Sequence, residues 1–232
     1  MKAAEITIPD EIFRALRSPR RTDEDRDRDE PRHIASLLAF FGIRQGMTVA
    51  DLMASRGYLA GTLAGIVGDT GKVYAQNSPR LLERFKGADP IAERITETGL
   101  TNTVSVICEL EDLKLPAGSL DVILSFMFYH DTIWVGTDRA AMNASVFTAL
   151  KPGAIFAVVD HHAAAGSGAS VAQTMHRIER KLVVDEVTAA GFMLTDETDL
   201  LENPDDPLDV LVFDKTVRDR THKFALKFQK PG

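Results

Sequence analysis

The stretch M-T-V-A-D-L-M-A-S-R-G-Y, residues 47–58, decides how this chain folds. Its first half, 47–52, is mostly apolar, which predicts a short buried strand. A turn of small residues follows, and the apolar run 59–67 predicts a helix that starts directly after the turn. A strand that passes through a tight turn into a helix is the repeating unit of parallel α/β sheets.

The same alternation of strand and helix continues on both sides of this stretch. Further strands are predicted at 72–76, 104–110, 120–127, 154–160, 192–199 and 223–228, and helices at 33–41, 90–98, 138–150 and 172–190. Most of the strands are mainly apolar, and the strand 120–127 is almost wholly so, as expected for a strand that helices cover on both faces. The pattern therefore predicts a doubly wound, mostly parallel α/β sheet.

Composition and charge exclude several classes of protein. The chain has 232 residues, a formal net charge of −7 and one cysteine, Cys108, which we expect to be buried on the third strand. A single cysteine cannot form a disulfide framework, and an acidic chain is a poor partner for nucleic acid. Residues 1–11 lack the apolar core of a signal peptide, and no apolar run is long enough to span a membrane. We expect a soluble, cytoplasmic protein.

Two segments stand apart from the regular pattern. Residues 17–32 hold six arginines and six acidic residues, which is typical of a solvated helix or a mobile lead-in, although a lid over a ligand cleft is an alternative. This divides the chain into a charged segment, 1–33, and a domain, 34–232. The connection 202–221 is long enough to be a functional loop, and its apolar stretch 210–213 would pack on the body of the domain.

Ligands of open α/β sheets bind beyond the carboxyl ends of the strands, so the residues that follow each strand are the candidate site. The turn 53–58 offers small residues and a helix N-terminus to a ligand. Asn77 ends the second strand, where an acid or amide commonly holds ribose hydroxyls. Glycines 57, 61 and 65 would let the helix lie close to the sheet.

Four motifs carry a resemblance to a known family: V-A-D-L-M-A-S-R-G-Y (49–58), L-P-A-G-S-L-D-V-I (115–123), A-L-K-P-G-A (149–154) and T-A-A-G-F (188–192). The sequence resembles the class I, Rossmann-like methyltransferases that use S-adenosylmethionine (SAM). It looks most like small bacterial predicted methyltransferases with an arginine–aspartate segment and a Tyr-His-Asp after the fourth strand. The resemblance implies seven strands, the last of them antiparallel, after an N-terminal helical segment.

The resemblance implies SAM as the cofactor and methyl transfer to a small molecule as the activity. The residues implied to bind the cofactor are Asp51, Ala54, Ser55, Gly57, Tyr58, Asn77, Glu111, Asp112, Ser125 and Phe126. Tyr129, His130 and His161 would face the substrate, and either histidine could act as a base, because histidine titrates near neutrality. The segments 17–41 and 202–221 would close over the cleft.

One departure from the family pattern leaves an alternative open. The family has glycines at the positions of residues 53, 55 and 57, whereas this chain has Met53, Ser55 and Gly57. Either the turn tolerates the larger side chains and SAM binds, or the chain is a non-methylating or inactive Rossmann-like protein that acts as a binding or partner protein.

Metal and partner assignments complete the expectations. His176 and Glu179 share a face of the predicted helix 172–190 and could form a metal site together with Asp160 and His161. Because the sequence lacks the tight ligand spacing of strong metal motifs, we interpret His176 and Glu179 as a structural pair, and no metal site is predicted. We expect no nucleic-acid or membrane partner. Exposed Phe and Leu side chains on the N-terminal helix would support a homodimer.

Overall fold

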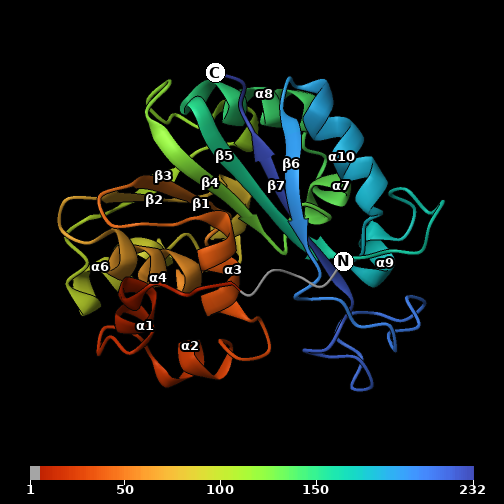
Figure 1. Ribbon diagram of the computed structural model, residues 1–232, viewed down its shortest axis with the longest axis horizontal. Coiled ribbons are helices and arrows are strands. Elements are labelled where there is room, and N and C mark those ends of the chain that lie inside the picture. The colour runs from red at the N-terminus through yellow and green to blue at the C-terminus, as the bar shows by residue number, and fades with distance from the viewer. Residues whose placement is uncertain (1–5) are drawn as a thin grey trace.

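The computed structural model describes residues 6–232, which form one seven-stranded sheet with helices on both faces (Figure 1). The strands are β1 (Thr48–Leu52), β2 (Lys72–Asn77), β3 (Thr103–Ile107), β4 (Leu120–Phe126), β5 (Leu150–His161), β6 (Met193–Thr198) and β7 (Lys223–Gln229). They lie in the order β3-β2-β1-β4-β5-β7-β6. β1 to β5 pair in parallel, and β7 runs antiparallel to both of its neighbours. The predicted doubly wound sheet, with its last strand antiparallel, is confirmed.

Alternate residues of the central strands face two separate cores. Val49 packs into a cluster with α1, α3, α4 and α6, whereas Ala50 packs into a cluster with α8 and α10 on the other face. The helices are α1 (Asp10–Leu16), α2 (Asp23–Asp27), α3 (Ile34–Phe41), α4 (Tyr58–Val67), α5 (Pro79–Glu83), α6 (Pro90–Thr98), α7 (Asp131–Val135), α8 (Arg139–Ala149), α9 (Ala172–Met175) and α10 (Arg180–Ala189), with a 3-10 turn η1 (Leu110–Asp112). Because successive apolar residues of β1 point to opposite faces of the sheet, each face is covered by a layer of helices.

The charged N-terminal segment is folded against the domain. Helix α1 packs on α4 so closely that a Cβ added at Gly65 would lie 2.9 Å from the Cβ of Ala15. The Arg21 guanidinium, itself buried, donates to both carboxylate oxygens of Asp29 at 2.5 and 2.6 Å. Of the segment 1–33, residues 1–5 lie outside the described part of the chain. For the rest, the interpretation as a mobile lead-in is wrong, because Ile12 and Ala15 are buried in the core and the buried side chains of Arg21 and Asp25 are paired.

The long helix predicted over 172–190 is wrong. The chain forms two helices, α9 and α10, which are separated by His176 in the left-handed conformation, with φ 54°. The next residue, Arg177, is fully buried and donates to Asp206 at 2.9 and 3.0 Å. A buried guanidinium needs such partners, and reaching them interrupts the helix that the apolar spacing predicts.

The connection 202–221 contains no regular helix or strand and is anchored on the domain by several contacts, two of which lie on either side of His176. The first is the Arg177–Asp206 ion pair, and the second is the Val212 N–H, which donates to the Met175 carbonyl at 3.2 Å. Val212 is buried, so the predicted packing of the apolar stretch 210–213 is confirmed for this residue. The anchored loop thereby lies beside α9.

None of the helices within residues 6–232 combines the length and the apolar character that crossing a membrane requires.

Candidate functional site

The turn after β1 has the backbone of a glycine-rich turn, although only one of the three glycines, Gly57, is present. Met53, Ser55 and Gly57 have φ values of 51°, 53° and 80°, so all three positions are left-handed. These are the positions at which the family resemblance implies glycine. A side chain in this conformation costs roughly 1–2 kcal/mol per residue, which other contacts must offset. The turn therefore keeps its shape despite the two substitutions.

Two amide side chains at the end of β2 hold this turn in place. Gln76 accepts from the Met53 N–H at 3.1 Å and donates to the Cys108 carbonyl at 2.7 Å. Asn77 accepts from the Ser55 N–H at 2.8 Å and donates to the Ser55 carbonyl at 3.0 Å. Both amides are fully buried. The Asn77 side chain thus supports the turn, and Asn77 lines neither of the two cavities described below, so its predicted role in holding a ribose stays a prediction.

Asp51, the last residue but one of β1, has a carboxyl oxygen without a hydrogen-bond partner among the described residues. This oxygen is Oδ2, and the side chain is buried. Burial raises the pKa of this carboxyl to about 7. An orphaned buried oxygen that lines a cavity is a site where a cationic or hydrogen-bond-donating ligand would be stabilised.

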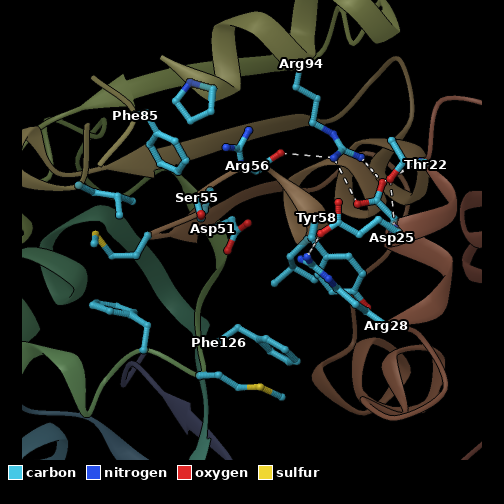
Figure 2. A pocket seen from close by; sticks show the side chains of 18 of the residues that line it. Thr22, Asp25, Arg28, Asp51, Ser55, Arg56, Tyr58, Phe85, Arg94 and Phe126 are labelled. Atoms are coloured by element: carbon cyan, nitrogen blue, oxygen red, sulfur yellow. Dashed lines mark hydrogen bonds and ion pairs between the residues drawn. The ribbon is translucent and has the colours of Figure 1, made fainter. Parts of the chain in front are cut away.

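The cavity beside Asp51, which we call the first cavity, has a volume of about 780 Å³ (Figure 2). Its walls come from the turn after β1, the ends of β4 and α6, and the N-terminal segment. Residues that line it include Asp25, Arg28, Arg32, Asp51, Met53, Ala54, Ser55, Arg56, Tyr58, Arg84, Phe85, Arg94, Phe126 and Met127. Of the residues predicted to bind the cofactor, Asp51, Ala54, Ser55, Tyr58 and Phe126 therefore share one cavity.

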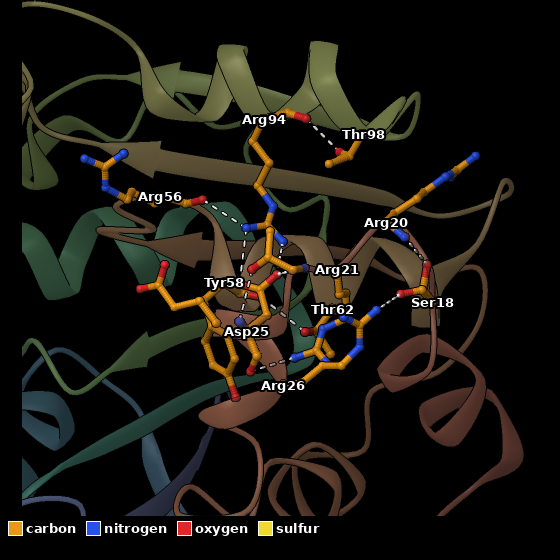
Figure 3. Close-up of polar contacts among 12 residues, drawn as sticks. Ser18, Arg20, Arg21, Asp25, Arg26, Arg56, Tyr58, Thr62, Arg94 and Thr98 are labelled. Atoms are coloured by element: carbon orange, nitrogen blue, oxygen red, sulfur yellow. Dashed lines mark hydrogen bonds and ion pairs between the residues drawn. The ribbon is translucent and has the colours of Figure 1, made fainter.

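An ion pair joins the N-terminal segment to α6 across the mouth of the first cavity (Figure 3). Arg94 donates to Asp25 at 2.5 Å and to the Arg56 carbonyl at 3.3 Å. Burial would raise the pKa of Asp25, but the hydrogen bonds from Arg94 and the Thr22 N–H, together with the charges of Arg94 and Arg21, outweigh burial and lower that pKa. The Tyr58 hydroxyl donates to Asp29 at 3.0 Å. Segment 17–32 is thus a wall of the cavity, which is the arrangement that a lid requires.

Gly57 contributes to the site by making room for α6. A Cβ at Gly57 would lie 2.9 Å from Cδ of Arg94 and 3.0 Å from Cδ1 of Ile91, and a Cβ at Gly61 would lie 2.8 Å from Nη2 of Arg94. The expectation that the repeated glycines bring the helix close to the sheet is wrong. They accommodate α6 and, at Gly65, helix α1.

A second cavity, of about 1170 Å³, adjoins the first. The two share Arg32, Met53, Met127 and Asp131 among their linings. Other residues that line the second cavity are Ser78, Arg80, Glu109, Leu110, Glu111, Phe128, His130, Trp134, His161, Gln173, His176, Val212 and Phe213. It thus extends along the carboxyl ends of the strands from η1 to the loop 202–221.

His130, at the start of α7, is held by the end of β5. Its Nδ1 lies 2.7 Å from Oδ1 of Asp160, and its backbone N–H donates to Oδ2 of the same carboxylate at 2.8 Å. Burial alone would lower the pKa of His130, but Asp160 and Asp131 outweigh it and raise that pKa to about 10. Without a ligand, His130 is therefore protonated at neutral pH and is not a free base.

His161 is the opposite case. Burial, reinforced by the positive charges of Lys223 and His130, lowers the pKa of His161 well below its ordinary value. Its Nδ1 lies 2.8 Å from the Thr221 hydroxyl, and the residue lines the second cavity. Of the two predicted bases, His161 is the one that is neutral and able to accept a proton.

Tyr129 is misplaced by the sequence prediction. Its side chain is fully buried in the core under α8 and α10, where the hydroxyl donates to Glu186 at 3.0 Å and accepts from Asn143 at 2.9 Å. Tyr129 lines neither cavity. The prediction that it faces the substrate is wrong, because the chain turns its ring away from the strand ends and into the core.

The remaining predicted residues are divided between the cavities and their surroundings. Glu111 lines the second cavity and accepts from the Asp138 N–H at 2.9 Å. Asp112 points to solvent beside Lys114 and lines neither cavity. Ser125 is buried in β4, and its hydroxyl has no partner among the described residues. Cys108 is buried as predicted, one residue beyond the end of β3.

The sequence did not point to Asp131 as part of the site, and His176 was interpreted as a structural partner of Glu179. Both line the second cavity, and His176 lies 3.3 Å from the Asp131 carboxylate. The sequence analysis placed His176 in the middle of a helix beside Glu179. That pairing is wrong, since Glu179 accepts from the backbone of Gly166 and Gly168 instead. The Tyr-His-Asp run at 129–131 was the one available signal for Asp131.

Comparisons with known proteins identify the fold. No family model matches the sequence, and no curated protein matches it. A SAM-dependent methyltransferase from Aquifex aeolicus is structurally similar, with a TM-score of 0.62, 19% identity and coverage of 86% of this chain and 89% of that one. A 1,6-didemethyltoxoflavin-N1-methyltransferase from Burkholderia thailandensis, solved with S-adenosylhomocysteine, has a TM-score of 0.55 and 16% identity over 90% of this chain and 80% of that one.

The fold is also compatible with other chemistry. The cyclase SpnF has a TM-score of 0.60 and 14% identity, with coverage of 95% of this chain and 91% of that one. At these identities the likeness concerns the fold. The sheet order, the antiparallel last strand and these neighbours together show that the chain has the Rossmann-like fold of class I SAM-dependent methyltransferases.

Proposed function

We propose that the protein transfers the methyl group of SAM to a small-molecule acceptor. The observation that carries this proposal is the unpartnered carboxylate oxygen of Asp51 beside a left-handed turn. The α-ammonium of SAM is a cation with three donors, so it would complete the hydrogen bonding of that oxygen. Asp51, Ala54 and Ser55 would hold the methionine part, and Glu111 would lie on the side of the nucleoside. Bound SAM supplies a methyl group that is already activated as a sulfonium.

The second cavity suits the acceptor. It combines aromatic walls from Phe128, Trp134 and Phe213 with the polar ends of the strands, a mixture that is typical of small-molecule sites. Because the methyl group is already activated, the protein has to align the acceptor and remove its proton. His161, which is neutral, is the proposed base.

The N-terminal segment would act as a lid over this site. Its Asp25 is paired with Arg94 at the mouth of the first cavity, and Arg32 lines both cavities. Opening the Asp25–Arg94 pair would free the segment for entry of a ligand. A homodimer through α1, where Phe13 is exposed, stays a prediction.

Calorimetric titration with SAM and, separately, with S-adenosylhomocysteine tests the proposal. We expect micromolar binding of both, and a loss of at least about 30-fold in affinity for Asp51→Asn, because a buried charged hydrogen bond contributes about 2 kcal/mol or more. Asp112→Asn is the matched control, since Asp112 is exposed outside both cavities. Equal losses in the two variants, or no binding by the folded wild-type chain, would contradict the proposed site.

A specific observation favours a second candidate function, that of a non-methylating Rossmann-like protein. Met53 stands where the resemblance implies glycine, and it lines both cavities. Its side chain could fill the space that the cofactor needs. SpnF, which has a similar fold, is described as a cyclase. Under this alternative, Met53→Gly gains SAM binding that the wild type lacks. Under the leading proposal, both bind SAM.

A further inference from the structure

Three side chains with metal-ligating atoms meet at the wall of the second cavity. His130 and Asp131 begin α7, and His176 follows α9, 46 residues away along the chain. Nε2 of His130 lies 3.1 Å from Oδ1 of Asp131 and 3.2 Å from Nδ1 of His176. Nδ1 of His176 lies 3.3 Å from the same Asp131 oxygen. The three atoms thus form a nearly equilateral triangle.

The size of this triangle fits a transition-metal ion. Zinc binds imidazole nitrogen and carboxylate oxygen at about 2.0–2.2 Å, and tetrahedral angles then place the ligand atoms about 3.3–3.5 Å apart. The observed separations of 3.1 to 3.3 Å need to widen only slightly. Two histidines and one carboxylate are also a donor set that zinc and ferrous iron both accept.

Two further contacts orient the triangle. Nδ1 of His130 lies 2.7 Å from Asp160 and can keep its proton as a donor to this carboxylate. A metal ion that displaces the proton on Nε2 would then meet the Nε2 lone pair on the side of the other two atoms. The Trp134 indole N–H donates to Oδ1 of Asp131 at 3.0 Å. Metal-binding histidines almost always donate their other N–H to such a carboxylate, which fixes the ring.

The left-handed break at His176 completes the cluster. A continuous helix over 172–190 would carry His176 along the helix face, whereas φ 54° at this residue directs the chain into Arg177 and its buried partners. The His176 ring packs against Phe213, with centroids 5.1 Å apart, so the anchored loop covers one side of the cluster. The second cavity, with Gln173 and His161 in its wall, lies at the other side.

We propose that His130, Asp131 and His176 bind one divalent transition-metal ion, of which zinc is the reference case, with an open position towards the second cavity. The acceptor class follows, and this part rests on the proposed function: a small molecule with a hydroxyl or thiol group that coordinates the ion through oxygen or sulfur. Coordination makes such a group more acidic. Its O–H or S–H bond then breaks, the proton passes to His161, the proposed base in the wall of the same cavity, and the electron pair stays on the acceptor atom.

Metal binding by the full-length chain, measured without SAM, tests the site. After chelator treatment and dialysis, the protein is titrated with Zn²⁺ against a chromophoric competitor and with Co²⁺ by visible absorption. We expect one equivalent of Zn²⁺ and a Co²⁺ spectrum typical of four-coordination. Removal of an outer contact alone typically costs 10–100-fold in metal affinity, so His176→Asn, which removes a ligand, should lose about 100-fold or more.

His33→Asn is a matched control. His33 and His176 both have left-handed backbones, with φ 46° and 54°, and asparagine tolerates this conformation. His33 is exposed, and it lies outside the second cavity. Its variant should bind zinc like the wild type. Asp160→Asn, which removes the partner of His130 and no ligand, should weaken zinc binding about 10–100-fold.

Two results would overturn the site: no stoichiometric binding of Zn²⁺ or Co²⁺ by the folded wild type, or equal affinity in wild type and His176→Asn. A proton that His130 shares with Asp131 would then explain the short contacts. Denaturant unfolding of each variant separates loss of metal from loss of fold. SAM titration of the metal-free protein is a separate measurement, so failure of the metal site and failure of the proposed function are distinguishable.

Discussion

The two cavities at the carboxyl end of the sheet differ in how their charges are compensated. In the first cavity, Asp51 is buried with an oxygen that has no partner among the described residues, and burial raises its pKa to about 7. Behind the wall of the second cavity, the buried Asp160 is paired with His130, which lines that cavity and whose pKa is raised to about 10. A buried carboxylate without a partner favours binding of a cation, whereas one with a partner orders its neighbours. The first cavity is therefore suited to a charged ligand, and the second to holding side chains in fixed positions.

A substitution at Gly57 should have the largest effect, and it should disrupt the first cavity without changing the side chains of the second. In Gly57→Val, we expect loss of SAM binding and at least about 3 kcal/mol of destabilisation, because left-handed strain adds to a clash. The new Cβ would meet Arg94 at 2.9 Å and Ile91 at 3.0 Å. Chemical unfolding and calorimetry measure the two effects.

Gly118→Val separates strain from the clash at Gly57. Gly118 has φ 58° and no atom within 4 Å of an added Cβ, so this variant should lose only about 1–2 kcal/mol. It should keep its SAM affinity. Similar behaviour of the two variants would contradict the account of Gly57 as the residue that accommodates α6.

Asp51→Asn should change how the free energy of unfolding depends on pH. The pKa of Asp51 is about 7 in the folded protein, against an ordinary value of 3.8. Between about pH 4 and pH 7 the Asp51 carboxyl is therefore protonated in the native state and ionised in the unfolded state. Stability of the wild type thus falls as pH rises from about 4 to 7, by at most about 4 kcal/mol. We expect the variant to lack this loss and to be more stable at pH 8.

Urea unfolding of wild type and Asp51→Asn at pH 5, 6, 7 and 8 measures this difference. The gap in the free energy of unfolding should open with rising pH and level off above pH 7. A gap that is constant over this range would show that Asp51 is ionised and solvated throughout. The variant would thus be more stable and bind SAM less well, which is the trade-off expected of a site residue.

Arg94→Met tests whether the N-terminal segment is a separable wall of the first cavity. The Arg94–Asp25 pair is largely buried, with side-chain exposures of 11% and 6%, so breaking it should cost about 1–3 kcal/mol. Hydrogen exchange in residues 17–33 should rise sharply, while exchange in β4 and β5 changes little. The double variant with Asp25→Asn should cost less than the sum of the two. Uniform exchange across the sheet would show that the segment is an integral part of the core.

The sheet could be predicted from the sequence because strand positions depend on local hydrophobic patterns. The site is harder, since it depends on which way single side chains turn after a strand ends. The hydrophobic pattern predicted the order β1–α4, and the family resemblance implied a role for Asp51, but neither predicted the use of Asn77 as a support for the Ser55 backbone. It could not give His176 either. The left-handed break there follows from the pairing of Arg177 with Asp206, which is distant in sequence.

Tyr129→Phe is the mildest test, and it separates the second cavity from the core behind it. The hydroxyl of Tyr129 contacts Glu186 and Asn143, and Glu186 is held independently by Arg139 at 2.7 Å. Loss of the hydroxyl leaves the Asn143 amide without that acceptor, so we expect a cost of about 1 kcal/mol. SAM affinity and zinc affinity should stay within about twofold of the wild type, since the ring lines neither cavity. A change in either affinity without a change in stability would show that Tyr129, like its neighbour His130, acts at the binding site.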